Sequence, residues 1–181
     1  LDELRYAKRG FNVIATANTR DRGVNIMSAA LKRRFNTVHL PLPSSVEAEL
    51  EIVESRLEAI GNRLSFPPLP PIQEQLKKVI SVFQELRKGE TLDGTQKIKC
   101  PSATLSTAEI IDLFVSSWSH SAYFGDGKIA LSSIAPNLVS CILKDPQKDK
   151  IILQEYLEAV LRRRKTHAAL YKELHHALST H

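Results

Sequence analysis

The fold class of this 181-residue chain follows from one segment, Phe11-Asn12-Val13-Ile14-Ala15-Thr16-Ala17-Asn18. Its residues 11–17 are mostly apolar or β-branched and follow Gly10, which predicts a short strand buried on both faces, as in a parallel sheet covered by helices. The polar loop 18–23 comes directly after this strand. Open α/β sheets bind ligands at the carboxyl ends of their strands, so this loop is the first place to expect a ligand.

The elements after this loop extend the same α/β pattern. The sequence predicts a short helix over 26–34 and a second strand over 36–40, which Pro41 and Pro43 end. These few elements cannot cover both faces of a sheet. We therefore expect residues 1–43 to be the last part of a larger α/β core, and the chain to be a piece of a longer protein.

From residue 44 onward the apolar residues recur at helical spacing, which predicts an all-α domain over 44–181. Capping-box pairs at Ser44 with Glu47 and at Ser106 with Glu109 mark two helix starts. Gly61 and Gly89 stand where a helix is expected to stop. The expected helices span 46–60, 72–88, 106–124, 134–143 and 147–178.

Composition places the chain among soluble globular proteins, with 43% hydrophobic and 25% charged residues. No apolar run approaches the roughly 18 residues that a membrane span needs, and the N-terminus has no signal-peptide pattern. Cys100 and Cys141 are isolated and lack the spacing of metal ligands, which is typical of thiols in a reducing compartment. The expected location is the cytoplasm.

The positive charge of the chain is concentrated at its N-terminus. Residues 1–40 hold eight Lys/Arg against three Asp/Glu, which equals the formal net charge of +5 for the whole chain. A smaller basic cluster lies at 162–165, where four consecutive residues spread around a helix and predict a solvated helix end. The N-terminal excess favours an anionic partner such as phosphate, nucleic acid or an acidic protein surface.

The order of these elements resembles a known family. A buried strand ends in Thr16-Ala17-Asn18-Thr19, a helix ends in Lys32-Arg33-Arg34-Phe35, and a second strand and a helical region follow. Residues 11–43 resemble the second half of an AAA+ ATPase core, most closely the MoxR-like branch, and residues 44–181 resemble its lid. The resemblance implies the α/β remnant of a P-loop NTPase parallel sheet followed by an all-α lid, mostly helical overall.

The resemblance also implies roles for three residues. Asn18 matches the family's sensor 1 residue, whose amide can contact the γ-phosphate and orient the attacking water. Arg34 matches the arginine finger, with Arg33 as the alternative, because a guanidinium suits the charge of a transferring phosphoryl group. Read without the resemblance, Asn18 is a turn residue and the two arginines only stabilise a helix C-terminus.

Two motifs of the family are missing from this sequence. It contains no G-x-x-x-x-G-K-[ST] loop and no apolar strand that ends in Asp-Glu, so the ligands of ATP and Mg²⁺ are expected outside this chain. The chain alone is expected to bind ATP poorly. Residues 105–109, where a sensor 2 arginine is expected, contain no Arg or Lys.

The function implied by the resemblance is ATP hydrolysis coupled to protein remodelling or chaperone-like work. It implies self-association into a ring, typically a hexamer, and by analogy a partner with a von Willebrand factor A-type domain. The alternative is a non-catalytic helical module that binds nucleic acid or an acidic protein. The histidines near the C-terminus, which lack metal-site spacing, predict no metal centre: His167, His175, His176 and His181.

Overall fold

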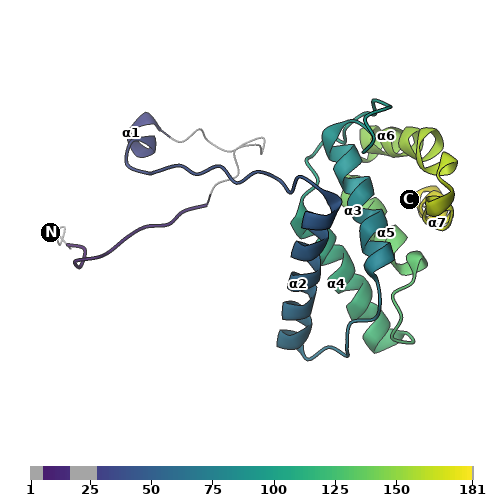
Figure 1. Ribbon diagram of the computed structural model, residues 1–181, viewed down its shortest axis with the longest axis horizontal. Helices are drawn as coiled ribbons and strands as arrows, with labels where there is room; N and C mark the ends of the chain where they lie inside the picture. Colours follow the sequence, from purple (N-terminus) through teal and green to yellow (C-terminus); the bar gives the residue numbers. More distant parts are fainter. Residues whose placement is uncertain (1–5, 17–27, 181) are drawn as a thin grey trace. The chain divides into compact units, whose positions relative to one another are not determined.

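The computed structural model describes residues 6–16 and 28–180. The chain divides into two compact units, an N-terminal unit over Leu1–Leu40 and a helical unit over Pro41–His181. The division falls within three residues of the boundary expected after residue 43. Figure 1 follows both units along the chain.

The described part of the N-terminal unit contains one helix and no strand. Helix α1 (Ala29–Lys32) is a single turn that begins at Ser28, whose side chain accepts the backbone N–H of Leu31. The helix expected over 26–34 is therefore shorter where the structure describes it. Residues 26 and 27 lie outside the described residues.

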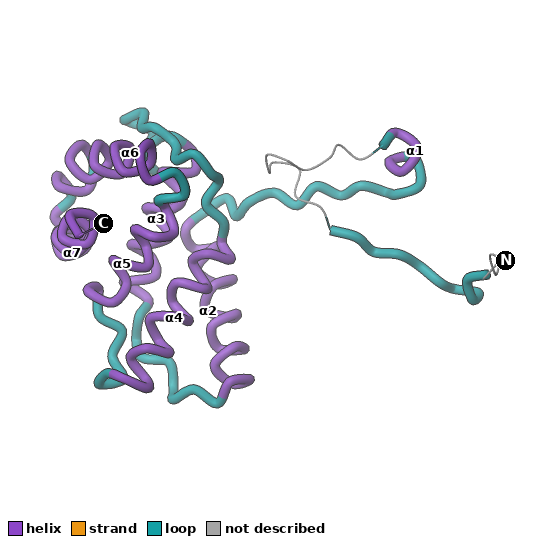
Figure 2. The backbone as a smooth tube through the Cα atoms, turned by 180° about the vertical axis from the view of Figure 1, so that it is seen from behind, coloured by secondary structure: helices purple, strands orange, loops and turns teal. Residues whose placement is uncertain are grey.

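The strands expected over 11–17 and 36–40 are not formed by the described residues, where the tube of Figure 2 shows no strand. Residue 17 lies outside the described residues. A β-strand needs the backbone of a neighbouring strand, and the described part of this chain offers none to either segment. Their apolar side chains consequently face solvent, with Phe11 67%, Ile14 95% and Val38 78% exposed. The sheet of an α/β core is thus absent from the part of the chain described here.

The helical unit is built from five helices, a break and a final helix, and its secondary structure agrees with the expected all-α domain. Helix α2 packs against α3 and α4, α4 packs against α5, and α5 packs against α7. In Figure 1 α2, α3 and α4 lie side by side, and α6 and α7 follow beyond α5. The elements are α2 (Val46–Leu64), α3 (Gln73–Lys88), α4 (Thr107–Phe124), α5 (Leu131–Ile142), α6 (Pro146–Ala159), the 3₁₀ turns η1 (Leu161–Arg163) and η2 (Lys165–His167), and α7 (Ala168–Thr180).

Helix α2 differs from its expected form at both ends. Ser45, not Ser44, is the N-cap, and its hydroxyl accepts the backbone N–H of Ala48. The helix also continues through Gly61 to Leu64 and ends at Ser65, which takes a left-handed conformation with φ 55°. The sequence predicts a helix stop at Gly61, but in the structure this glycine leaves room for a neighbouring ring. A Cβ there would lie 2.2 Å from a ring carbon of Trp118.

The glycine stop at Gly89 and the capping box at Ser106 are confirmed, whereas the helix predicted over 134–143 begins three residues earlier, as α5 (Leu131–Ile142). Helix α3 ends at Gly89, which has a left-handed φ of 72°. Helix α4 begins with the capping box, because Ser106 accepts the backbone N–H of Glu109 while the Glu109 carboxylate accepts that of Ser106.

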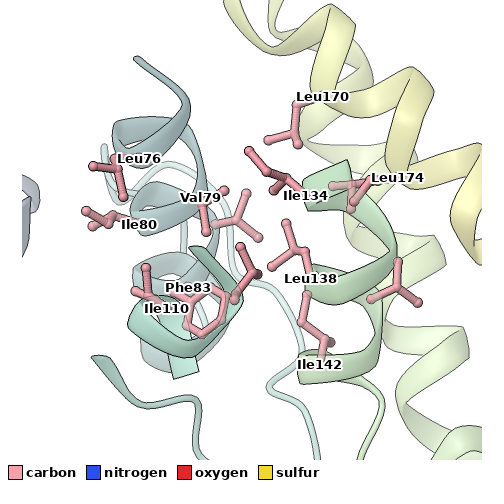
Figure 3. Close-up of a cluster of buried hydrophobic side chains, with 14 of the residues drawn as sticks. Leu76, Val79, Ile80, Phe83, Ile110, Ile134, Leu138, Ile142, Leu170 and Leu174 are labelled. Atoms are coloured by element: carbon pink, nitrogen blue, oxygen red, sulfur yellow. The ribbon is translucent and has the colours of Figure 1, made fainter. Parts of the chain in front are cut away.

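The hydrophobic core lies where α3, α4, α5 and α7 meet, as the close-up in Figure 3 shows. Phe83 of α3 lies close to Ile110 of α4, and Leu138 of α5 faces this pair. Ile134 lies on the same face of α5 as Leu138, next to Leu170 of α7. These side chains are fully buried, and α5 packs against both α4 and α7.

The prediction of one long helix over 147–178 is wrong. Helix α6 ends at Ala159, two 3₁₀ turns follow, and α7 starts at Ala168. The break lets α7 return to α5 and bury Leu170 and Leu174, which a straight helix would carry away from the core. Apolar spacing continues across the break and does not reveal it.

No helix among the described residues is long and apolar enough to cross a membrane.

Candidate functional site

The structure describes two of the three residues that the sequence analysis singled out. Asn18 lies outside the described residues. Arg33 and Arg34 follow α1, and their backbone N–H groups bond to the carbonyls of the helix. Both residues are exposed. Their role as finger residues stays a prediction.

A buried ion pair joins the first turns of α2 and α4 to the end of α3. The Glu49 carboxylate is fully buried and lies 3.0 Å from Nη2 of Arg87. It also accepts hydrogen bonds from Gln84 Nε2 at 2.9 Å and from Thr107 Oγ1 at 2.7 Å. One carboxylate thus connects three helices.

This cluster was not visible in the sequence, because its members are far apart along the chain. Residues 105–109 contain no cation at the start of α4. The structure brings Arg87 close to this helix start, because the Glu49 carboxylate contacts both Arg87 and Thr107. The Nε atom of Arg87 and Oε1 of Gln84 are buried and have no hydrogen-bonding partner among the described residues. A buried carboxylate without a neighbouring cation is costly, so Arg87 is needed to neutralise the charge of Glu49.

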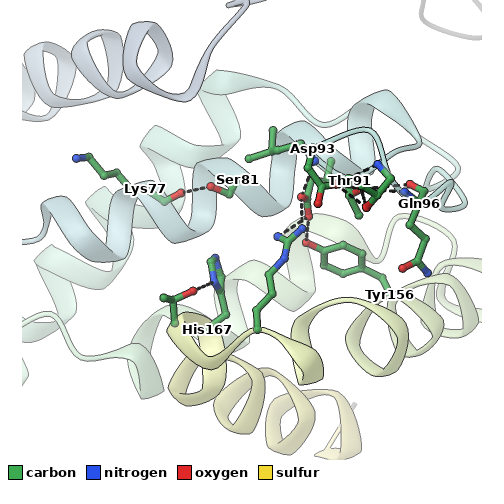
Figure 4. Close-up of polar contacts among 12 residues, drawn as sticks. Lys77, Ser81, Thr91, Asp93, Gln96, Tyr156 and His167 are labelled. Carbon is green, nitrogen blue, oxygen red and sulfur yellow. Dashed lines mark hydrogen bonds and ion pairs between the residues drawn. The ribbon is translucent and has the colours of Figure 1, made fainter.

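A second buried carboxylate, Glu85, contacts residues on both sides of the break between α6 and α7 and in the loop after α3; Tyr156, one of them, is labelled in Figure 4. Arg164 donates from Nη2 to Oε1 at 2.6 Å and from Nη1 to Oε2 at 3.1 Å. The hydroxyl of Tyr156 donates to Oε2 at 2.7 Å, and the backbone N–H of Leu92 donates to Oε1 at 2.8 Å. Burial, and then the adjacent Glu85 charge, raise the pKa of Tyr156 well above its usual value, so its hydroxyl stays a proton donor.

This arrangement corrects the expectation for the basic run 162–165. The run does not lie at a solvated helix end but on the two 3₁₀ turns. Arg164 is half-buried and paired with Glu85, while Arg162 pairs with Glu158 on the surface. Arg164 therefore helps to hold the path of the chain, while Arg162, Arg163 and Lys165 stay exposed.

A third carboxylate, Asp149, ties the start of α6 to the loop before α4. It accepts the backbone N–H groups of Ser102, Lys144 and Asp145 at 2.7, 3.0 and 2.8 Å. The hydroxyl of Ser102 adds a fourth bond at 2.7 Å. Burial acts to raise the pKa of Asp149, but these hydrogen bonds outweigh it and lower the pKa below the usual range.

The described residues form no metal site, since they hold no group of three or more His, Cys, Asp or Glu side chains placed to bind an ion. His167 is half-buried on η2, whereas His175 and His176 are exposed on α7. His181 lies outside the described residues. The three carboxylate clusters connect elements of the helical unit, whereas the predicted site residues Asn18, Arg33 and Arg34 belong to the N-terminal unit.

Comparison with known proteins identifies the family of the helical residues. Residues 47–179 match the family model described as the YehL-like AAA+ ATPase C-terminal domain. The chain is also 34% identical over 180 residues to the uncharacterised protein YehL of Escherichia coli (strain K12). That match covers 96% of this chain and 47% of the relative, so the chain spans about half the length of the relative. No solved structure matches the chain. On the family match and the relative together, this chain belongs to the YehL-like AAA+ ATPase C-terminal domain family.

Proposed function

We propose that this chain is the C-terminal part of an ATP-hydrolysing AAA+ machine of the MoxR-like branch, which couples ATP hydrolysis to remodelling of a partner protein. The observation that carries the proposal is the family match over 47–179, which coincides with the helical unit. The helical unit is the lid of this machine. The whole protein would bind ATP and Mg²⁺ through residues outside this chain.

In the complete protein, residues 11–17 and 36–40 are strands of the α/β core. The exposure of Phe11, Ile14 and Val38 supports this assignment, since such large apolar side chains are normally covered. Asn18 orients the attacking water in its own subunit. A neutral amide suits this task because it positions the water and γ-phosphate without adding charge.

Arg34 acts on the nucleotide of the neighbouring subunit, with Arg33 as the alternative. Their exposure supports this role, because a finger residue must reach beyond its own subunit. A permanent guanidinium charge stabilises the transferring phosphoryl group. The role requires self-association into a ring, and a hexamer is the proposed form. A protein with a von Willebrand factor A-type domain is the proposed partner, by family analogy.

Substitution of Arg34 in the full-length protein tests this function. Arg34→Ala is expected to lower ATP turnover by about 10³- to 10⁵-fold, because the transition-state charge loses its cation. ATP binding, measured by fluorescence of a nucleotide analogue, is expected to stay within about twofold, since the ground state gains little from the finger.

Lys172→Ala is the matched control, because Lys172 is an exposed residue of α7 and the change also removes one surface cation. Turnover of Arg34→Ala equal to that of this control contradicts the finger assignment. If Arg33→Ala has the large effect instead, the finger is Arg33.

The alternative function, a module that binds nucleic acid or an acidic protein, draws on the excess charge of residues 1–40. It predicts binding that weakens steeply with salt, because each phosphate contact releases counterions. Nucleotide-dependent assembly of the full-length protein, without salt-sensitive binding to DNA or RNA, favours the ATPase.

A further inference from the structure

A groove lies between residues 96–99 and helix α6, and it encloses about 310 Å³. One wall is formed by Lys97, Ile98 and Lys99, and the other by Ile152, Glu155, Tyr156 and Ala159. Figure 4 labels Gln96 and Tyr156, which belong to the two walls. The floor is therefore largely apolar, and the rim on one side is an extended stretch of backbone.

The extended stretch uses only one of its two backbone edges. Glu90 and Lys97 form an antiparallel bridge, flanked by hydrogen bonds from Thr91 N–H to the Gln96 carbonyl and from Ile98 N–H to the Gly89 carbonyl. In extended backbone, alternate residues direct their N–H and C=O groups to opposite edges. Within the described chain the N–H and C=O groups of Lys97 and Lys99 accordingly have no hydrogen-bonding partner.

The side chains along this edge add a charge pattern. Lys97 and Lys99 are two residues apart and so project from the same face, with 82% and 65% of their side chains exposed. Each forms only a surface ion pair, with Glu90 and Glu155 respectively. Exposed ion pairs of this kind add little to stability, so a carboxylate from another molecule can replace either partner.

We propose that this groove binds an extended segment of a partner protein, which pairs with the free backbone edge of Lys97 and Lys99. Backbone groups free at every second residue fit another extended chain, because a β-strand repeats its own donors and acceptors with the same period. Acidic residues two apart in the partner lie beside the lysines. The alternate apolar side chains point the other way, beside Ile98 and over Ile152 and Ala159.

The site is short and well delimited. Pro101 has no backbone N–H and prevents the edge from continuing past Cys100. A partner segment of about five residues is therefore sufficient to occupy it. The inference does not depend on the ATPase role, since it rests on the helical unit and needs no nucleotide.

Amide hydrogen exchange tests the proposal on the full 181-residue chain. The probe is the blocked peptide acetyl-Glu-Leu-Glu-Leu-Glu-amide, and NMR follows the exchange of each backbone amide. The peptide at saturation is expected to slow exchange of the Lys97 and Lys99 amides by at least about tenfold, because both gain a hydrogen-bond acceptor. The same peptide with every internal amide N-methylated is expected to give no protection.

Charge-reversed variants provide the second measurement. Lys97→Glu combined with Lys99→Glu is expected to weaken peptide binding by at least about tenfold, since two attractive contacts become repulsive. Lys172→Glu on α7 changes one surface charge away from the edge and is expected to leave the Kd within about twofold.

Three results overturn the proposal. Unprotected Lys97 and Lys99 amides at millimolar peptide show that the edge does not pair. Equal binding of the N-methylated peptide shows that the contact is only electrostatic. Protection that rises with the concentration of the chain alone identifies a second copy as the occupant instead of a partner segment.

Discussion

Gly61 shows how a single residue can be misread when its neighbours in space are unknown. In the sequence it stands at the end of an apolar stripe and favours a helix stop. In the structure it lies inside α2, where Trp118 of α4 covers it and Phe66 packs edge-on against the Trp118 ring, with centroids 5.0 Å apart. The missing side chain is what allows the indole to approach the helix.

Gly61→Ala is therefore expected to destabilise the chain, although alanine is the better helix former. The new methyl would lie 2.2 Å and 2.7 Å from two ring carbons of Trp118. Overpacking costs about 1–3 kcal/mol, which exceeds the gain of about 1 kcal/mol in helix propensity. Urea unfolding followed by circular dichroism measures the change.

A Trp118→Leu background separates packing from propensity. In that background Gly61→Ala is expected to become neutral or stabilising, because the ring is gone. An equal loss of stability in both backgrounds would show that the contact with Trp118 is not the cause.

Among the elements, those with local signals could be predicted and the others could not. The capping box at Ser106 and the glycine end at Gly89 act within four residues of themselves, and the structure confirms both. The break at 160–167 depends on Glu85, which lies 79 residues from Arg164 and leaves no local trace. The described residues 11–16 and 36–40 form no strand for a similar reason, because no pairing strand is among the described residues. The strands at 11–17 and 36–40 therefore stay a prediction.

The candidate site also contains some residues that the sequence could reveal and others that it could not. Arg33 and Arg34 could be selected because their context in the sequence matches a known pattern. The Glu49–Arg87 pair could not, since its residues come from two helices and only the fold brings them to Thr107. Periodicity shows which residues are buried, but it does not show which buried charges meet.

The start of α6 depends on Asp149, and this gives the element a pH-dependent stability. The native pKa of Asp149 is depressed, so its contribution is present above the unfolded-state pKa of about 3.9 and is lost as the pH falls through the native value. Asp149→Asn is expected to cost about 2 kcal/mol or more near pH 6, because the amide cannot accept all four hydrogen bonds.

The difference in unfolding free energy between the wild type and Asp149→Asn is expected to shrink as the pH is lowered from 6 toward 2. Asp112→Asn on α4 is the control, since Asp112 is exposed, and it is expected to stay within about 0.5 kcal/mol of the wild type. A gap between wild type and Asp149→Asn that is constant across this pH range would contradict a role for the charge.

At the scale of the whole molecule, the two units differ in how they are stabilised. Every buried hydrophobic residue of the described chain lies between Leu50 and Leu178, within the helical unit. The described part of the N-terminal unit contributes none. The helical unit therefore has the core it needs to fold as a domain of its own.

A fragment of residues 41–181 is expected to unfold cooperatively with the same urea midpoint, within error, as the 181-residue chain. Its core is complete without residues 1–40, so their removal takes no buried apolar surface from it. Circular dichroism during urea unfolding gives the midpoint, and the m-value reports the cooperativity of the transition. A fragment that fails to unfold cooperatively would show that the N-terminal unit is part of the same folding domain.

The Glu85 cluster has a consequence for the order in which the helical unit forms. Its bonds span 71 residues to Tyr156 and 79 to Arg164, whereas α2 and α3 are joined by a loop of a few residues. Closing a long loop costs more chain entropy, so the distant contacts are expected to form after the local helix pairs. The break between α6 and α7 is then expected to close late on the folding path, and loss of the Glu85–Arg164 pair is expected to speed unfolding more than it slows folding.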